Sequence, residues 1–178
     1  MSLARFFRRN PHAGLARNLH EELVGQARQP AFYAVLGAPD TVDGRFDLLA
    51  LHLYLAMRRL EREPEAAALN QALFDEAFGH LDVAVREMGA QDIGVGRRVK
   101  RMAEGFHGRS KALEEALGRD DAALRECLRR NVYGKVEPEE ARLTQLAVYV
   151  RETDRLIQAL PWADIAGGRV RFAPLPTA

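Results

Sequence analysis

Residues 64–89, PEAAALNQALFDEAFGHLDVAVREMG, decide the fold class of this chain. Apolar residues recur at every fourth position along this stretch, a spacing that places them on one face of an α-helix. Pro64 is well placed to open the helix, because its missing N–H is not needed in the first turn. Gly89 is a natural end, since glycine readily takes the left-handed conformation that terminates helices. The apolar stripe consists of Leu69, Leu73, Ala77, Leu81 and Val85, widened by Phe74, Phe78 and Met88.

The chain on the N-terminal side of this helix shows the same helical spacing. A first helix is predicted from the start pair Asn10–Pro11 to Pro30, and a short helical turn follows over residues 31–36. A third helix begins after Asp40 or Thr41, either of which can cap it. The apolar positions are Leu15, Leu19, Leu23 and Ala27 in the first helix, and Phe46, Leu49, Leu53, Met57 and Leu60 in the third.

Three more helices are predicted on the C-terminal side. Asp92 and Asp120 are placed to cap the fifth and sixth helices, and Pro138 begins a seventh that lasts until Pro161. The sequence therefore predicts an all-α fold, with a single bundle-like domain of about seven helices. The predicted divisions are a basic N-terminal segment over residues 1–9, a helical domain over residues 10–161 and a C-terminal arm or tail over residues 162–178.

Composition excludes several classes of protein. The 178 residues are 47% hydrophobic and 29% charged, which is ordinary for a folded globular chain. A formal net charge of +1 gives no global attraction to DNA, RNA or an anionic membrane. The single cysteine, Cys127, cannot form an intramolecular disulfide, which fits a reducing compartment. No stretch approaches the roughly 20 apolar residues that span a bilayer, so we expect a cytoplasmic protein.

The sequence carries no recognisable catalytic or metal-binding motif. Serine occurs only as Ser2 and Ser110, and neither lies in a Gly-x-Ser-x-Gly turn. The best metal candidate is Glu76 with His80, four residues apart on one helix face, but a di-metal helical bundle needs paired Glu-x-x-His motifs. We therefore expect a non-enzymatic protein with no catalytic residue, no metal and no cofactor. A helical metal or redox protein is the alternative.

Two groups of charged residues are candidate binding sites. One is the basic helix face at residues 97–101, followed by Arg109, which either is solvated or binds RNA, the ribosome or an anionic surface. The other comprises the polar helix junctions at residues 40–47 and 86–92. One interpretation is that these junctions contain only helix caps and surface ion pairs. The other is that they form a buried Arg–carboxylate network or a peptide-recognition groove. Together with two aromatic residues, the candidate binding residues are Phe32, Tyr33, Asp40, Arg45, Arg86, Arg98, Lys100, Arg101 and Arg109.

Several short motifs are weak alone but specific in their order and spacing. They are Ala27-Arg28-x-Pro30-x-Phe32-Tyr33, Pro39-Asp40-Thr41-x-x-Gly44-Arg45-Phe46-Asp47, Leu51-His52, the single residues Phe74, Phe78 and Asp82, Arg86-Glu87-Met88-Gly89-x-x-Asp92, Val95-Gly96-x-Arg98-Val99-Lys100-x-Met102-x-Glu104-x-Phe106-x-Gly108-Arg109, and Asn131-Val132-Tyr133. In these motifs, residues 17–160 resemble the ubiquinol–cytochrome c chaperone family. One departure is His107, where the family pattern has tyrosine.

The resemblance implies a chaperone that assists cytochrome b during assembly of respiratory complex III. It also implies contact with newly synthesised cytochrome b, and it raises the ribosome and a small helical partner as further partners. The basic, aromatic start of the chain is compatible with peripheral contact at the inner membrane. An apolar client needs an exposed apolar groove, for which Phe32, Tyr33, Phe6 and Phe7 are candidates. The alternative is a ribosome- or RNA-associated module that uses the Arg97–Arg101 face.

Overall fold

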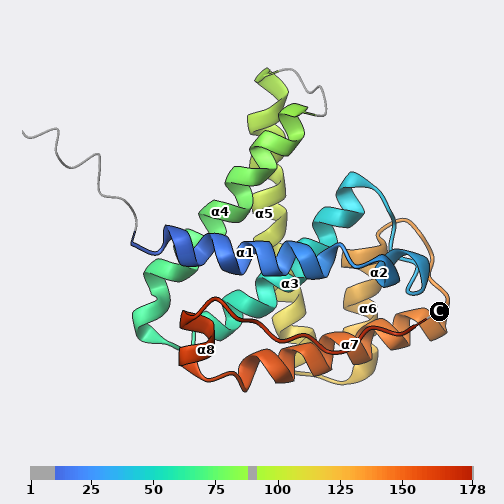
Figure 1. Ribbon diagram of the computed structural model, residues 1–178. Coiled ribbons are helices and arrows are strands. Elements are labelled where there is room, and N and C mark those ends of the chain that lie inside the picture. The colour runs from blue at the N-terminus through green and yellow to red at the C-terminus, as the bar shows by residue number, and fades with distance from the viewer. Residues whose placement is uncertain (1–10, 88–91, 178) are drawn as a thin grey trace, which may run out of the picture.

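The computed structural model describes residues 11–87 and 92–177, with side chains for residues 11–79 and 100–177. Every regular element in these ranges is a helix, which confirms the all-α fold (Figure 1). Each of the seven predicted helical segments has a counterpart. The elements are α1 (Ala13–Ala27), α2 (Pro30–Ala34), α3 (Val42–Leu60), the 3₁₀ turn η2 (Pro64–Ala66), α4 (Ala67–Glu87), α5 (Asp92–Leu117), α6 (Asp121–Leu128), the π-helical turn η3 (Arg129–Tyr133), α7 (Glu140–Gln158) and α8 (Trp162–Ala166).

Helix α3 lies at the centre of the protein. It packs against α1, α4, α5, η3 and α7, so it is buried on nearly all sides. The predicted single stripe is therefore too narrow, because Leu48, Leu51 and Leu55 are also buried. Leu49 and Met57, which the periodicity places inside, are only partly buried. A helix that is apolar around most of its circumference is typical of the centre of a bundle.

Helix starts follow the capping residues in the sequence. The hydroxyl of Thr41 accepts a hydrogen bond of 3.1 Å from the backbone N–H of Gly44, so Thr41, and not Asp40, caps α3. Asp120 caps α6 in the same way, by accepting from the N–H of Ala123 at 2.8 Å. Pro30 is the first residue of α2. These local signals fix where the chain turns between helices.

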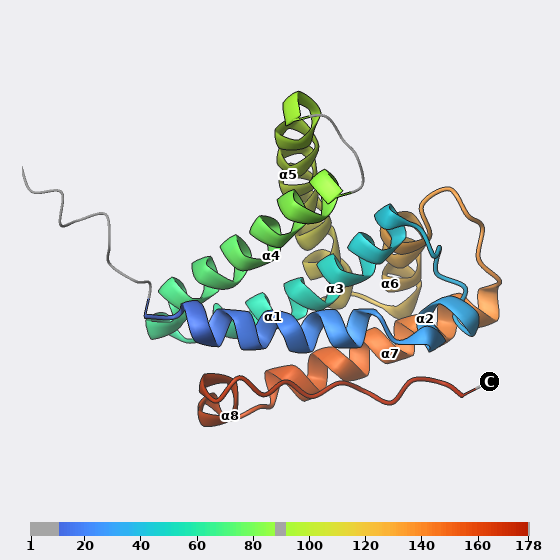
Figure 2. The ribbon, with the colours of Figure 1, turned by 45° about the horizontal axis from the view of Figure 1, so that its top comes forward.

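Helices α4 and α5 form an antiparallel pair that rises away from the other helices (Figures 1 and 2). At its base, the rings of Phe74, Phe78 and Phe106 pack together, with centroids 4.4 to 5.9 Å apart. Phe46 of α3 joins them, 6.2 Å from Phe78. This aromatic cluster ties the pair to the central helix.

The C-terminal segment, predicted as an arm or tail, contains the short helix α8 and then an extended arm over residues 169–177. The arm runs along α7 in both views (Figures 1 and 2). Its residue Ala173 is buried and donates a backbone hydrogen bond of 3.1 Å to the hydroxyl of Thr153 on α7. The ring of Phe172 lies 5.7 Å from the buried His52 ring. Residues 169–172, in which arginine alternates with an apolar residue, are extended without strand pairing in the described chain.

Candidate functional site

The main concave surface near the predicted binding residues lies between the first turns of α3 and the middle of α5. We call this surface the α3–α5 cleft. It has a volume of about 480 Å³. Its lining is mainly polar, with charges of both signs around Phe46 and Met102. The lining residues are Asp43, Phe46, Asp47, Arg101, Met102, Gly105 and Arg109.

The most constrained part of the cleft is an ion pair between its two walls. Arg109 of α5 lies 3.0 Å from Asp47 of α3, and the Asp47 side chain is only 14% exposed. The guanidinium of Arg109 also stands 5.8 Å from the centroid of the Phe46 ring, a cation–π contact. Burial raises the pKa of Asp47 to about 6, although Arg109 opposes the shift. Arg109 therefore holds the two walls together while its own side chain stays about one third exposed.

A second ion pair precedes the cleft at the start of α3. Arg45 donates to Asp40 at 2.6 Å, and this hydrogen bond holds the pKa of the Asp40 carboxyl below its usual value. The hydroxyl of Tyr33 donates to the carbonyl of Ala27 at 2.9 Å, and burial raises the Tyr33 pKa. The Asp40–Arg45 pair is exposed, so its contribution to stability is small.

The structure does not bring all the predicted site residues together. Arg101 and Arg109 line the α3–α5 cleft, while Tyr33 of α2 lies near Asp40 and Arg45 at the start of α3. Lys100 is exposed and pairs with Glu104 at 3.8 Å. The side chains of Arg86 and Arg98, like residues Phe6 and Phe7, lie outside the part of the chain that the structure describes.

The expectation of an exposed apolar surface at Phe32 is wrong. Phe32 is 0% exposed, and its ring packs edge-on against His52 and Tyr149 with centroids 5.3 and 5.1 Å apart. His52 in turn bonds the hydroxyl of Tyr149 at 2.7 Å, and burial lowers the pKa of His52 to about 4. Sequence periodicity could not reveal this, because α2 is too short to show which of its faces is inward.

Residues that sequence reasoning did not select complete the cleft. Phe46 and Asp47 stand in the quoted motif but were not among the candidate binding residues. The structure pairs Arg45 with Asp40 and Asp47 with Arg109. The Asp47–Arg109 contact joins residues far apart in the chain, so no local spacing signals it.

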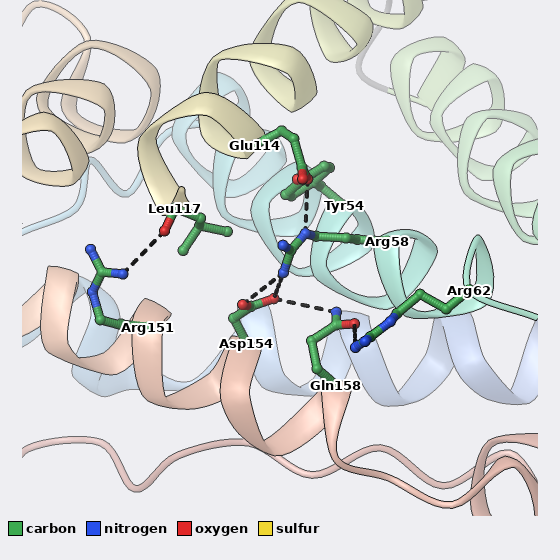
Figure 3. Close-up of polar contacts among 8 residues, drawn as sticks. All are labelled: Tyr54, Arg58, Arg62, Glu114, Leu117, Arg151, Asp154 and Gln158. Carbon is green, nitrogen blue, oxygen red and sulfur yellow. Dashed lines mark hydrogen bonds and ion pairs between the residues drawn. The ribbon is translucent and has the colours of Figure 1, made fainter. Parts of the chain in front are cut away.

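A polar network below the cleft joins three helices (Figure 3). Arg58 of α3 donates to Glu114 of α5 at 2.8 Å and to both carboxylate oxygens of Asp154 of α7 at 2.7 and 2.8 Å. The hydroxyl of Tyr54 also donates to Glu114. Because Arg58 is largely shielded from solvent, these charge-assisted bonds are stronger than those of surface pairs. The network fixes α5, and with it one wall of the cleft, relative to α3 and α7.

The surroundings of Cys127 and Glu76 determine what chemistry these two residues can do. Cys127 is buried, and burial raises the pKa of its thiol, which disfavours the reactive thiolate. Glu76, the proposed metal residue, lies 3.6 Å from Arg17, and the side chain of His80 is outside the described part. Among the described residues, no group of three or more metal-ligating side chains occurs. Within the same limits, no helix is both long and apolar enough to cross a bilayer.

Comparison with known proteins gives a consistent result. A sequence profile of the family described as ubiquinol-cytochrome C chaperone matches residues 34–172. The chain is 23% identical to ubiquinol-cytochrome-c reductase complex assembly factor 1 of Xenopus laevis over 146 residues, which cover 81% of this chain and 73% of the relative. The crystal structure of the Cbp3 homologue from Brucella abortus superposes with a TM-score of 0.82 and 33% identity, covering 98% of each chain. This chain belongs to the ubiquinol–cytochrome c chaperone family.

Proposed function

We propose that this chain is a non-enzymatic chaperone that binds newly synthesised cytochrome b during assembly of ubiquinol–cytochrome c reductase. The family, and the assembly-factor name of the Xenopus laevis relative, support a role in complex III assembly. The α3–α5 cleft is the candidate site, because its mainly polar lining, with charges of both signs beside Met102, suits the backbone and polar side chains of an extended peptide. In this proposal the client contacts the cleft before its partner subunits are in place.

The cleft offers each kind of contact that peptide recognition needs. Met102 is only partly buried and provides apolar surface for a client side chain, next to the buried Phe46. Arg101 provides a guanidinium, which can bind a carboxylate or backbone carbonyl through paired, charge-assisted hydrogen bonds. Arg109 and Asp47 form an ion pair, so a client that covers them meets compensated charges, although Oδ1 of Asp47 accepts no hydrogen bond within the described chain.

The same charges argue against the RNA or ribosome alternative for the Arg97–Arg101 face. Binding to RNA draws on a run of uncompensated positive charge along the phosphate backbone. Lys100 instead pairs with Glu104, and Arg101 shares the cleft with Asp43 and Asp47. The described part of the face is therefore close to neutral, which favours a protein client. We also propose that the protein acts in the cytoplasm, at the surface of the inner membrane into which such a client is inserted.

Capture of cytochrome b by the full-length chain tests the proposal. An affinity-tagged copy is expressed in cells, and cytochrome b that copurifies is measured by immunoblotting. We expect Arg101→Ala with Met102→Ser to lower the yield at least fivefold. Lys111→Ala serves as the matched control, because Lys111 is an exposed cation ten residues further along α5, about 15 Å away. Equal capture by the cleft variant and the control would overturn the assignment of the cleft.

The cleft variant must also be shown to fold. Arg101 is exposed and Met102 only partly buried, so their replacement should change the free energy of unfolding by less than about 1 kcal/mol. A variant that melts like the wild type but loses cytochrome b has lost recognition. Failure of the wild-type chain to capture any cytochrome b would refute the client.

A further inference from the structure

An apolar groove lies between α7 and the C-terminal arm, and none of its lining residues lines the α3–α5 cleft. We call it the α7–arm groove; it has a volume of about 410 Å³. Val148 stands at its edge with 65% of its surface exposed, more than either Val42 or Val136. Apolar atoms dominate the surface of the groove. The lining residues are Thr144, Gln145, Val148, Tyr149, Glu152, Ala173, Pro174, Leu175 and Pro176.

The walls of the groove are fixed by internal bonds. The arm is attached to α7 by the hydrogen bond from Ala173 to the fully buried hydroxyl of Thr153. Phe172 inserts next to His52 in the core, and two prolines stiffen the chain that follows it. A preformed groove binds a partner at a lower cost in conformational entropy than one that must be ordered first.

The charges around the groove are already compensated. Glu152 pairs with Arg155 at 2.5 Å, and Arg151 pairs with Asp121 at 2.9 Å. The hydroxyl of Thr144 donates a hydrogen bond of 2.8 Å to the backbone carbonyl of Glu140. A charged segment entering the groove would lose hydration and find no free charge of opposite sign. An uncharged apolar segment would be stabilised by burial of Val148 and Leu175.

We propose that the α7–arm groove binds an uncharged, apolar helix of the client protein. The inference rests on the proposed function. The client in that proposal is a subunit of a membrane complex, and such a subunit exposes apolar helices before it is inserted into the bilayer. A helix lying along α7 would place apolar side chains on either side of Val148, because a second, smaller depression adjoins that residue between α6 and α7. The cleft and the groove would then recognise different parts of one client, one polar and one apolar.

Binding of a model peptide to the full-length protein tests this groove without cytochrome b. The probe is a fluorescent 20-residue Leu/Ala helix with lysines only at its two ends, and fluorescence anisotropy gives its Kd. We expect Val148→Asp to raise the Kd at least tenfold. Val136→Asp places the same charge at another exposed valine, in the loop before α7 and outside the groove lining, and should leave the Kd within twofold.

Three results would overturn the proposal. Equal binding by wild type and Val148→Asp would show that the peptide does not use the groove. An equal loss in both variants would show that the loss does not depend on the α7–arm groove. Dimerisation of the wild type that Val148→Asp abolishes, without peptide binding by either protein, would show that a second copy of this chain is the occupant. The peptide assay can fail while capture of cytochrome b at the cleft succeeds, so the two proposals are tested separately.

Discussion

Replacing Gly44 with alanine should destabilise the protein, although alanine is the better helix former. Gly44 lies in the first turn of α3 and is buried. A Cβ atom built on it would stand 2.1 Å from the carbonyl oxygen of Pro39 and 3.0 Å from the carbonyl carbon. The obstacle is backbone, so no side-chain rotation relieves the overlap. The loop that carries Asp40 must move away from α3 instead.

The expected magnitude follows from two opposing effects. Alanine in place of a helical glycine contributes about 1 kcal/mol of stability. Overpacking of a close contact costs about 3 kcal/mol when backbone must shift. Gly44→Ala should therefore lose about 2 kcal/mol. Gly108→Ala is the matched control, because Gly108 lies in helix α5 and its new Cβ would meet nothing within 4 Å. It should gain up to about 1 kcal/mol.

Thermal unfolding followed by circular dichroism measures the two variants under identical conditions. For a chain of this length, a difference of about 3 kcal/mol corresponds to a difference of about 6–12 °C in Tm, with Gly108→Ala the more stable. Urea unfolding should give the same order at 25 °C. If Gly44→Ala melts at or above the wild-type temperature, the tight approach of Pro39 to α3 is not present, and the reasoning on this loop is refuted.

The remaining predictions concern charge and core packing. Burial lowers the folded-state pKa of His52 to about 4, so its contribution to stability is present above the unfolded pKa near 6.5 and is lost as the pH falls toward 4. Between about pH 6.5 and pH 4, the free energy of unfolding should therefore fall by about 3 kcal/mol less in His52→Phe than in the wild type. Urea unfolding at several pH values measures this difference. Asp154→Ala removes a shielded partner of Arg58 and should lower the free energy of unfolding by about 1–3 kcal/mol. Arg155→Ala breaks an exposed pair on the same helix and should lower it by less than about 1 kcal/mol. Equal losses in the two variants would argue against the network. Leu53→Ala should lower the free energy of unfolding by about 2–5 kcal/mol, because Leu53 is 1% exposed at the centre of the bundle; a loss below 1 kcal/mol would contradict that placement.

Helix positions could be predicted well from the sequence because their signals are local. The four-residue spacing of Leu69, Leu73 and Ala77 marks α4, and the cap at Asp120 marks the start of α6. Which face of each helix is buried was less predictable. Periodicity assumes one buried face, whereas α3 is surrounded by other helices and buries Leu48, Leu51 and Leu55 outside its predicted stripe.

The candidate site was only partly accessible to sequence reasoning. Arg101 could be selected because it belongs to the basic face at residues 97–101, and Arg109 because it follows that face on the same predicted helix. Both line the α3–α5 cleft. The pairing of Arg109 with Asp47 depends on how α5 crosses α3, which no local spacing encodes. The α7–arm groove depends likewise on the path of the arm, which returns along α7 after α8.

The amount of assembled complex III in a strain that lacks this gene tests the central claim most directly. Native gels of the membranes, together with the reduced-minus-oxidised spectrum of b-type haem, measure the complex and its cytochrome b. The account predicts that both fall severalfold, that another respiratory complex keeps its wild-type level, and that the wild-type gene restores complex III. Wild-type levels of cytochrome b and of assembled complex III in the deletion strain would contradict it.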